Sequence, residues 1–255
     1  MSIVQIVFSP TGGTQRVTDI ITGEWNMPVQ RLDLTDEKIS PDFPTLGKED
    51  VAVLSVPSFG GRVPALAFQR IAKIDGNQAK CILICVYGNR AYEDTLTELN
   101  DIAEKNGFHV IAAIAAVAEH SIMHQYAAGR PDGEDEEELR HFARRILEKI
   151  QTDSPLASPP QIPANHPYKE YKVSNLIPEA DESCNLCGHC ANICPAHAIS
   201  QDQPNLTDSS ACISCMRCVA KCPQSARKVD HNMVFALSEK VKEICTVRKR
   251  NELYL

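Results

Sequence analysis

Eight cysteines near the C-terminus form two runs with identical spacing. The runs cover residues 184–195 and 212–223, and each reads C-x2-C-x2-C-x3-C-P. Thiolates are strong metal ligands, and the N-terminal residues show no secretion signal that would favour disulfides instead. Zinc sites usually use two separated pairs of cysteines, whereas each run here is a quartet that closes on a proline. The spacing therefore indicates a metal site other than an ordinary zinc site.

Each cysteine run resembles the cluster-binding run of the bacterial ferredoxins that carry two [4Fe–4S] clusters. In that family the fourth cysteine of each run binds the other cluster. The resemblance therefore implies one cluster on the ligands Cys184, Cys187, Cys190 and Cys222. It implies a second cluster on the ligands Cys212, Cys215, Cys218 and Cys194.

A second group of residues near the N-terminus has the composition of a phosphate-binding loop. It is the stretch Ser9-Pro10-Thr11-Gly12-Gly13-Thr14, placed between a strand pattern and a helix pattern. Glycines let the backbone wrap an anion, and the amides with the three hydroxyls can donate to it. The stretch matches neither G-x-x-x-x-G-K-[ST] nor G-x-G-x-x-G, the two common nucleotide-binding patterns. Because it has no lysine, it suits a tightly held phosphate monoester better than a triphosphate.

The elements that must position this loop alternate along residues 1–151. Apolar segments predict strands at 3–8, 29–34, 51–56, 80–87 and 109–117. Amphipathic segments predict helices up to about residue 22 and at 64–74, 92–106 and 134–150. Near-continuous apolar strands between such helices are typical of a parallel sheet covered on both faces. The sequence therefore predicts a doubly wound α/β domain with five parallel strands.

The phosphate loop and two later loops together resemble the flavodoxins, whose loop reads [S/T]-x-T-G-x-T and holds FMN. The resemblance implies strand order 2-1-3-4-5, with Phe59 and Tyr92 against the flavin ring and Tyr87 as a weaker candidate. It implies a peptide at Gly60 or Gly61 that meets the flavin. The flavin-binding residues it implies are Ser9, Thr11, Gly12, Gly13, Thr14, Ser58, Phe59, Gly60, Gly61, Gly88, Asn89 and Tyr92.

Composition changes along the chain divide it into four segments. Residues 1–151 form the expected FMN domain, 152–178 a proline-rich linker, 179–229 the expected ferredoxin domain and 230–255 a helical tail. The net charge is −7, and residues 179–255 carry nine acidic and nine basic residues. Because no basic face dominates, nucleic acid is an unsuitable partner. Without an apolar span of membrane length, we expect a cytoplasmic protein.

Taken together, the two halves resemble the flavodoxin–ferredoxin fusion proteins. That resemblance favours an electron carrier that passes electrons between its clusters and FMN, and exchanges them with a redox partner protein or a small-molecule acceptor. One alternative is a reductase whose substrate lies near Arg62, Arg90 and His120. Another is a redox-sensing or docking module that uses the basic stretch at 248–250.

Overall fold

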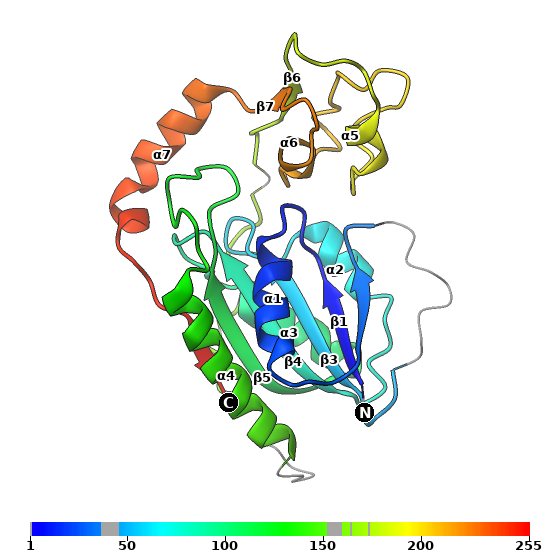
Figure 1. Cartoon of the computed structure of the whole chain (residues 1–255), viewed down its shortest axis with the longest axis vertical. Coiled ribbons are helices and arrows are strands. Elements are labelled where there is room, and N and C mark those ends of the chain that lie inside the picture. The colour runs from blue at the N-terminus through cyan, green and yellow to red at the C-terminus, as the bar shows by residue number, and fades with distance from the viewer. Residues whose placement is uncertain (1, 37–45, 152–159, 164, 173) are drawn as a thin grey trace.

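The computed structural model describes residues 2–36, 46–151, 160–163, 165–172 and 174–255. An α/β domain within residues 2–151 forms the larger part, and a small cysteine-rich unit lies beyond the carboxyl ends of its strands (Figure 1). The predicted linker falls partly outside the described residues, because 152–159, 164 and 173 are among the residues that are not described.

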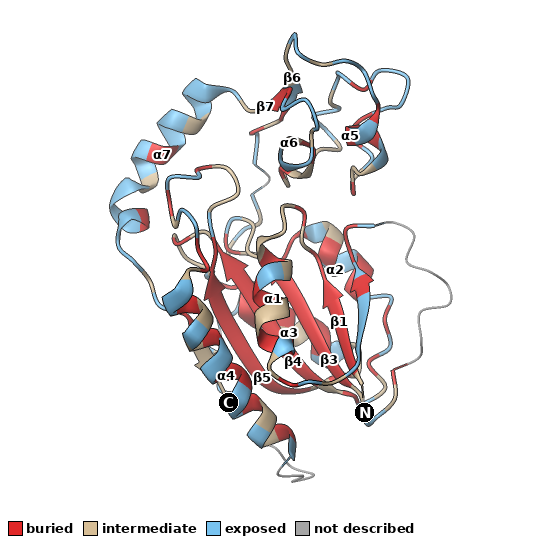
Figure 2. Ribbon diagram, in the orientation of Figure 1, coloured by how far each residue is buried: buried red, intermediate tan, exposed pale blue. Residues whose placement is uncertain are grey.

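Five parallel strands form the centre of the α/β domain, in the predicted order β2-β1-β3-β4-β5. Their bounds are β1 Ile3–Val7, β2 Val29–Asp33, β3 Val51–Pro57, β4 Lys80–Tyr87 and β5 His109–Val117. Four of them are apolar and buried along almost their whole length (Figure 2), which is what a parallel sheet with two covered faces requires. The edge strand β2 is mostly exposed.

Four helices cover the two faces of this sheet. They are α1 Gly13–Gly23, α2 Ala65–Ile71, α3 Thr95–Lys105 and α4 Gly133–Gln151. Val17 of α1 and Leu139 of α4 belong to one apolar core, whereas Ile71 of α2 and Leu99 of α3 belong to the other. Helix α4 begins with an acidic first turn, which complements the helix dipole.

The C-terminal tail departs from the predicted helix at its end. Helix α7, His231–Thr246, is followed by strand β8, Glu252–Tyr254. Strand β8 pairs antiparallel with β5, so the sheet has six strands where the sequence predicted five. A three-residue strand is too short to show a periodic pattern, and the free edge of β5 supplies its pairing partner.

The small unit contains two copies of the same local structure, one for each cysteine run. Its elements are β6 Glu179–Ala180, α5 His189–Asn192, α6 Arg217–Ala220 and β7 Arg227–Lys228. Each short helix begins at the sixth residue of its run. The two short strands pair antiparallel. Among the described residues, no helix has both the length and the apolar composition needed to cross a bilayer.

Apolar and polar contacts between described residues join the small unit to the α/β domain. Ile213, inside the second cysteine run, packs against the core that contains α2 and α3. The buried Arg70 donates from Nη2 to the carbonyl of Pro195 at 2.9 Å. Arg217 Nη2 lies 4.0 Å from the carboxylate of Asp33 at the end of β2. The second run and the end of the first thus face the sheet.

Candidate functional site

A cavity of about 80 Å³ opens where loops meet at the carboxyl ends of the parallel strands. We call it the strand-end cavity. This is the position at which doubly wound α/β domains bind their ligands. The sequence-predicted residues that line it are Thr11, Gly13, Thr14, Ser58, Phe59, Gly88 and His120.

The N-terminal loop forms the floor expected for an anion. Helix α1 begins at Gly13, and its N-cap Gly12 has a φ of 101°, a left-handed conformation that favours glycine. The hydroxyl of Ser9 accepts a hydrogen bond from the amide of Gln15 at 2.9 Å and so fixes the loop on the helix. The first amides of a helix have no partner within it, which makes this end suitable for a phosphate.

The loop after β3 is a tight turn that presents one aromatic ring to the cavity. Phe59 and Arg62 exchange backbone hydrogen bonds of 3.0 and 3.2 Å across Gly60 and Gly61. Both glycines have positive φ, 61° and 87°, as the two central residues of a type I′ turn require. Gly60 and Gly61 do not line the cavity, whereas Phe59 does.

Tyr92, the second predicted ring contact, is not brought into the cavity. Its hydroxyl donates to Glu252 at 2.6 Å and lies 2.8 Å from the hydroxyl of Tyr254, both in β8. The ring stands 5.3 Å from that of Tyr87, centroid to centroid. Tyr87 itself lines the cavity. Tyr87, the weaker candidate, therefore forms part of the cavity wall, and Tyr92 packs against Tyr87 outside the cavity lining.

Asn89 also contacts the C-terminal tail instead of the strand-end cavity. Its Nδ2 donates to the carbonyls of Cys245 at 2.7 Å and Val247 at 2.9 Å. Its Oδ1 accepts from the amide of Lys249 at 3.1 Å. The side chain is buried and fastens the end of α7 to the loop after β4. In this arrangement the amide of Asn89 binds the tail and does not point to a flavin in the strand-end cavity.

His120 is the one of the three predicted catalytic candidates that lines the cavity. Its Nδ1 accepts hydrogen bonds from the amides of Ile122 and Met123, both at 3.2 Å, so the ring proton resides on Nε2. Burial, aided by the charges of His124 and Arg90, lowers the pKa of His120 to about 4. At neutral pH the ring is therefore uncharged and offers an N–H donor.

The two predicted arginines are engaged in ion pairs outside the cavity lining. Arg62 forms a two-pronged pair with Glu98 at 2.8 Å, and its guanidinium stacks over the ring of Tyr168. Arg90 pairs with Glu93 through both of its terminal nitrogens, at 2.9 and 3.0 Å. The reductase alternative therefore retains His120 but neither arginine as a cavity residue.

The eight cysteines of the two runs surround two separate cavities in the small unit. We call them the first and second cysteine cavities. The cysteines of the first are Cys184, Cys187, Cys190 and Cys222. The cysteines of the second are Cys194, Cys212, Cys215 and Cys218. These are the two quartets that the sequence predicted, including the exchange of the fourth cysteine.

The backbone around both cysteine cavities is arranged to face negative charge. Leu186 and Ser214, at matching positions of the two runs, have left-handed φ values of 57° and 51°. Such a residue costs roughly 1–3 kcal/mol unless it is glycine, and it turns successive amides toward one point, as in known iron–sulfur sites. The amides of Ala198, Ser214 and Ala226 donate to cysteine sulfurs at 3.3–3.4 Å. The donor set and its surroundings fit an anionic thiolate-bound cluster.

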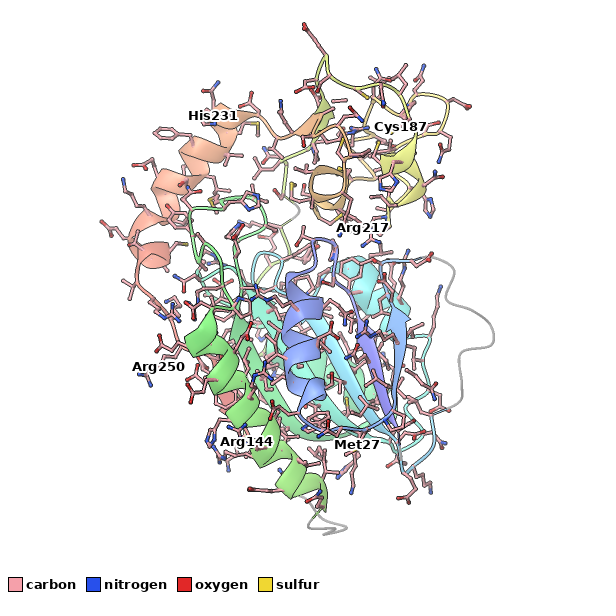
Figure 3. All side chains as sticks on the ribbon, viewed as in Figure 1. Met27, Arg144, Cys187, Arg217, His231 and Arg250 are labelled. Carbon is pink, nitrogen blue, oxygen red and sulfur yellow. The ribbon has the colours of Figure 1, made fainter. Side chains whose placement is uncertain are left out.

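The second cysteine cavity and the strand-end cavity share a residue. Cys215 lines both, although it belongs to the small unit. Figure 3 shows the neighbouring Arg217 on the side of the small unit that faces the sheet, and Cys187 farther from it. Cys187 is exposed. Sequence spacing could pair the cysteines but could not show which quartet would face the α/β domain.

Comparison with protein families identifies the small unit. Residues 168–227 match the family described as a 4Fe-4S dicluster domain, and the strand order 2-1-3-4-5 is that of flavodoxin-like sheets. The chain joins a flavodoxin-like domain to a 4Fe–4S domain. A 4Fe–4S domain points to electron transfer as the general role of this fusion. No curated protein has significant sequence similarity to the chain.

Several solved flavodoxins resemble the flavodoxin-like domain at low sequence identity. A flavodoxin from the domain Archaea is 14% identical at a TM-score of 0.45, over 59% of this chain and 99% of that one. A flavodoxin from Streptococcus pneumonia TIGR4 is 18% identical at 0.42, over 58% and 99%. A WrbA-like flavodoxin from Agrobacterium tumefaciens is 14% identical at 0.45, over 60% and 99%.

Proposed function

We propose that the protein is an electron carrier in which two [4Fe–4S] clusters and one FMN exchange electrons within a single chain. The clusters are assigned to the two cysteine cavities and FMN to the strand-end cavity. The observation that carries the proposal is the shared wall: Cys215 lines both the second cysteine cavity and the strand-end cavity. A cluster held by Cys215 and a flavin in the strand-end cavity would therefore be neighbours.

FMN is the flavin that suits the flavodoxin-like domain. The loop at the start of α1 offers backbone amides and hydroxyls but no lysine, which fits a single phosphate monoester held permanently. Phe59 and Tyr87 supply apolar walls. When bound, FMN supplies chemistry in either one-electron or two-electron steps. His120, neutral in its Nε2–H form, holds a proton at the cavity wall.

The positions of the cavities suggest an order for the centres. The first cysteine cavity lies away from the sheet and includes the exposed Cys187, so a partner can approach it. The second cysteine cavity lies between it and the strand-end cavity. We therefore assign the first cluster to exchange with an external redox partner and the second to exchange with FMN. Residues of this chain line the cavities at both ends of the proposed electron-transfer route.

Contacts between the two domains would hold the second cluster in place. Ile213 is packed against the domain core, and Arg70 and Arg217 make polar contacts across the joint. Two centres held in one molecule meet at a high effective concentration, so transfer does not depend on collision between molecules. This favours a relay over two independent carriers that happen to be fused.

Cofactor content and reduction together test this function. After anaerobic cluster reconstitution with added FMN, we expect about eight iron atoms and one FMN per chain. Cys215→Ser should lose the spectroscopic signal of one cluster and keep FMN, whereas Cys245→Ser, which alters a cysteine outside both runs, should keep everything. Protein that retains no flavin, or only half the iron, would contradict the proposal.

A further inference from the structure

Two arginines in the 4Fe–4S domain each have a buried side-chain nitrogen without a hydrogen-bond partner. Within the part of the chain that the structure describes, the buried side-chain nitrogen and oxygen atoms without a hydrogen-bond partner are Arg217 Nε and Arg227 Nε. An unpaired buried donor costs about 1–3 kcal/mol, and more when it carries charge. Two such donors in one small domain therefore require an explanation.

Each of these arginines lines a different cysteine cavity. Arg227 lines the first and Arg217 the second. They come from different elements, since Arg227 begins β7 and Arg217 begins α6. The unsatisfied nitrogens are thus distributed one to a cavity, where four thiolates and a cluster would place negative charge.

Arg227 is a buried cation surrounded by neutral acceptors. It is 2% exposed. Nη1 donates to the hydroxyl of Thr207 at 2.7 Å, and Nη2 donates to the carbonyl of Pro204 and lies 3.5 Å from Cys190 Sγ. No carboxylate within the described residues forms an ion pair with it. A buried charge without a counter-charge is strongly unfavourable, so the anion must come from the cavity itself.

Arg217 is less confined to its cavity, because its guanidinium also approaches a carboxylate of the other domain. Its Nη2 lies 4.0 Å from Asp33 of the flavodoxin-like domain, and its side chain is 19% exposed. Its own backbone amide donates to the sulfur of Cys215. Arg227, by contrast, is buried, and its Nη2 lies 3.5 Å from Sγ of Cys190 in the first cavity. Each arginine is therefore assigned to the cluster of the cavity that it lines.

We propose that Arg217 and Arg227 each donate a hydrogen bond from Nε to a sulfur of the cluster in their cavity, and that these cations set the reduction potentials of the two clusters. A reduced cluster carries one more negative charge than an oxidised one, so a nearby cation stabilises the reduced form and raises the potential. Arg227 acts on the first cluster and Arg217 on the second. This inference rests on the two clusters of the proposed function but requires neither FMN nor the relay.

The test replaces each arginine in the full-length, cluster-loaded chain and measures both midpoint potentials by an anaerobic titration followed by EPR. R217Q should lower the midpoint potential of one cluster. The expected shift is at least 59 mV, which for a one-electron centre corresponds to a tenfold change in the oxidised-to-reduced ratio. R227Q should lower the midpoint of the other cluster by a similar amount. R217K and R227K, which keep the charge but lose Nε geometry, should recover part of each shift.

Lys221→Gln is the matched control, because it removes an exposed positive charge next to the ligand Cys222. Because solvent screens this charge, the oxidised-to-reduced ratio of each cluster at a given potential should stay within twofold of that in the unmodified protein. If R227Q fails to assemble clusters, R217Q decides the question alone. Unchanged midpoints in an R217Q protein that retains both clusters would overturn the proposal. Because the clusters titrate without flavin, this failure is distinguishable from failure of the relay.

Discussion

Cys215 and Phe59 line the same cavity, although one comes from the 4Fe–4S domain and the other from the turn after β3. The contact between domains is therefore placed at the ligand-binding end of the sheet and not on a remote face. A cofactor seated against Phe59 would be adjacent to a cluster ligand.

Phe59→Ala should weaken FMN binding about tenfold, since ring stacking contributes roughly 0.5–1.5 kcal/mol beyond buried area. Titration of flavin-free protein with FMN, followed by flavin fluorescence, gives the dissociation constant. Phe68→Ala is the control, because Phe68 is 41% exposed on α2 and away from the cavity lining. Equal losses in the two variants would argue against a flavin contact by Phe59.

Tyr92→Phe should lower the free energy of unfolding by about 1–2 kcal/mol and leave FMN affinity unchanged. The reason is that its hydroxyl serves β8 through Glu252 and Tyr254, and hydrogen bonds to charged groups contribute about that much. Urea denaturation measures the first quantity and fluorescence titration the second. A large loss of FMN affinity with normal stability would restore Tyr92 as the ring contact that the sequence indicated.

Gly61→Ala should destabilise the turn after β3 far more than Gly12→Ala destabilises the loop before α1. Both positions have positive φ, 87° and 101°, so both alanines carry backbone strain of about 1 kcal/mol or more. At Gly61 the new Cβ would also fall 1.8 Å from the carboxylate of Glu93, whereas nothing lies within 4 Å of it at Gly12. Thermal unfolding of the two variants should separate the steric from the conformational cost. Equal costs would contradict this account of the turn.

Stability should fall as the pH decreases from 7 toward 5.5, in part because of His120. Its pKa is about 4 in the folded chain, below its ordinary 6.5, so the unfolded chain binds the extra proton first. The expected loss is about 1 kcal/mol over this range. His120→Gln should remove that part of the slope, and His141→Gln, at an exposed position on α4, should keep it. Denaturant titrations at several pH values measure the slopes, and identical slopes in all three proteins would contradict the prediction.

The sequence predicts the layers of this fold well because its signals are local. Four of the five parallel strands are apolar runs, and each helix that covers the sheet has a face that matches one of the two cores. The cysteine spacing likewise determines which quartet closes around which cavity. In both cases the relevant residues are near one another in the chain or repeat a fixed pattern.

What the sequence does not predict depends on segments that meet from far apart. Strand β8 is too short to show a sequence pattern. Because it pairs with β5, its residue Glu252 accepts a hydrogen bond from Tyr92. The end of α7 engages Asn89 in the same way. The side of the 4Fe–4S domain that faces the sheet follows from the packing of Ile213, which no spacing rule encodes.

The most direct test of the relay is the concentration dependence of electron transfer from cluster to flavin. A light-activated reductant would load the clusters of the full-length protein under anaerobic conditions, and flavin absorbance would be followed at several protein concentrations. The account predicts first-order flavin reduction with one rate constant at every concentration, as expected for centres held on either side of Cys215. A rate constant that rises in proportion to protein concentration would contradict it.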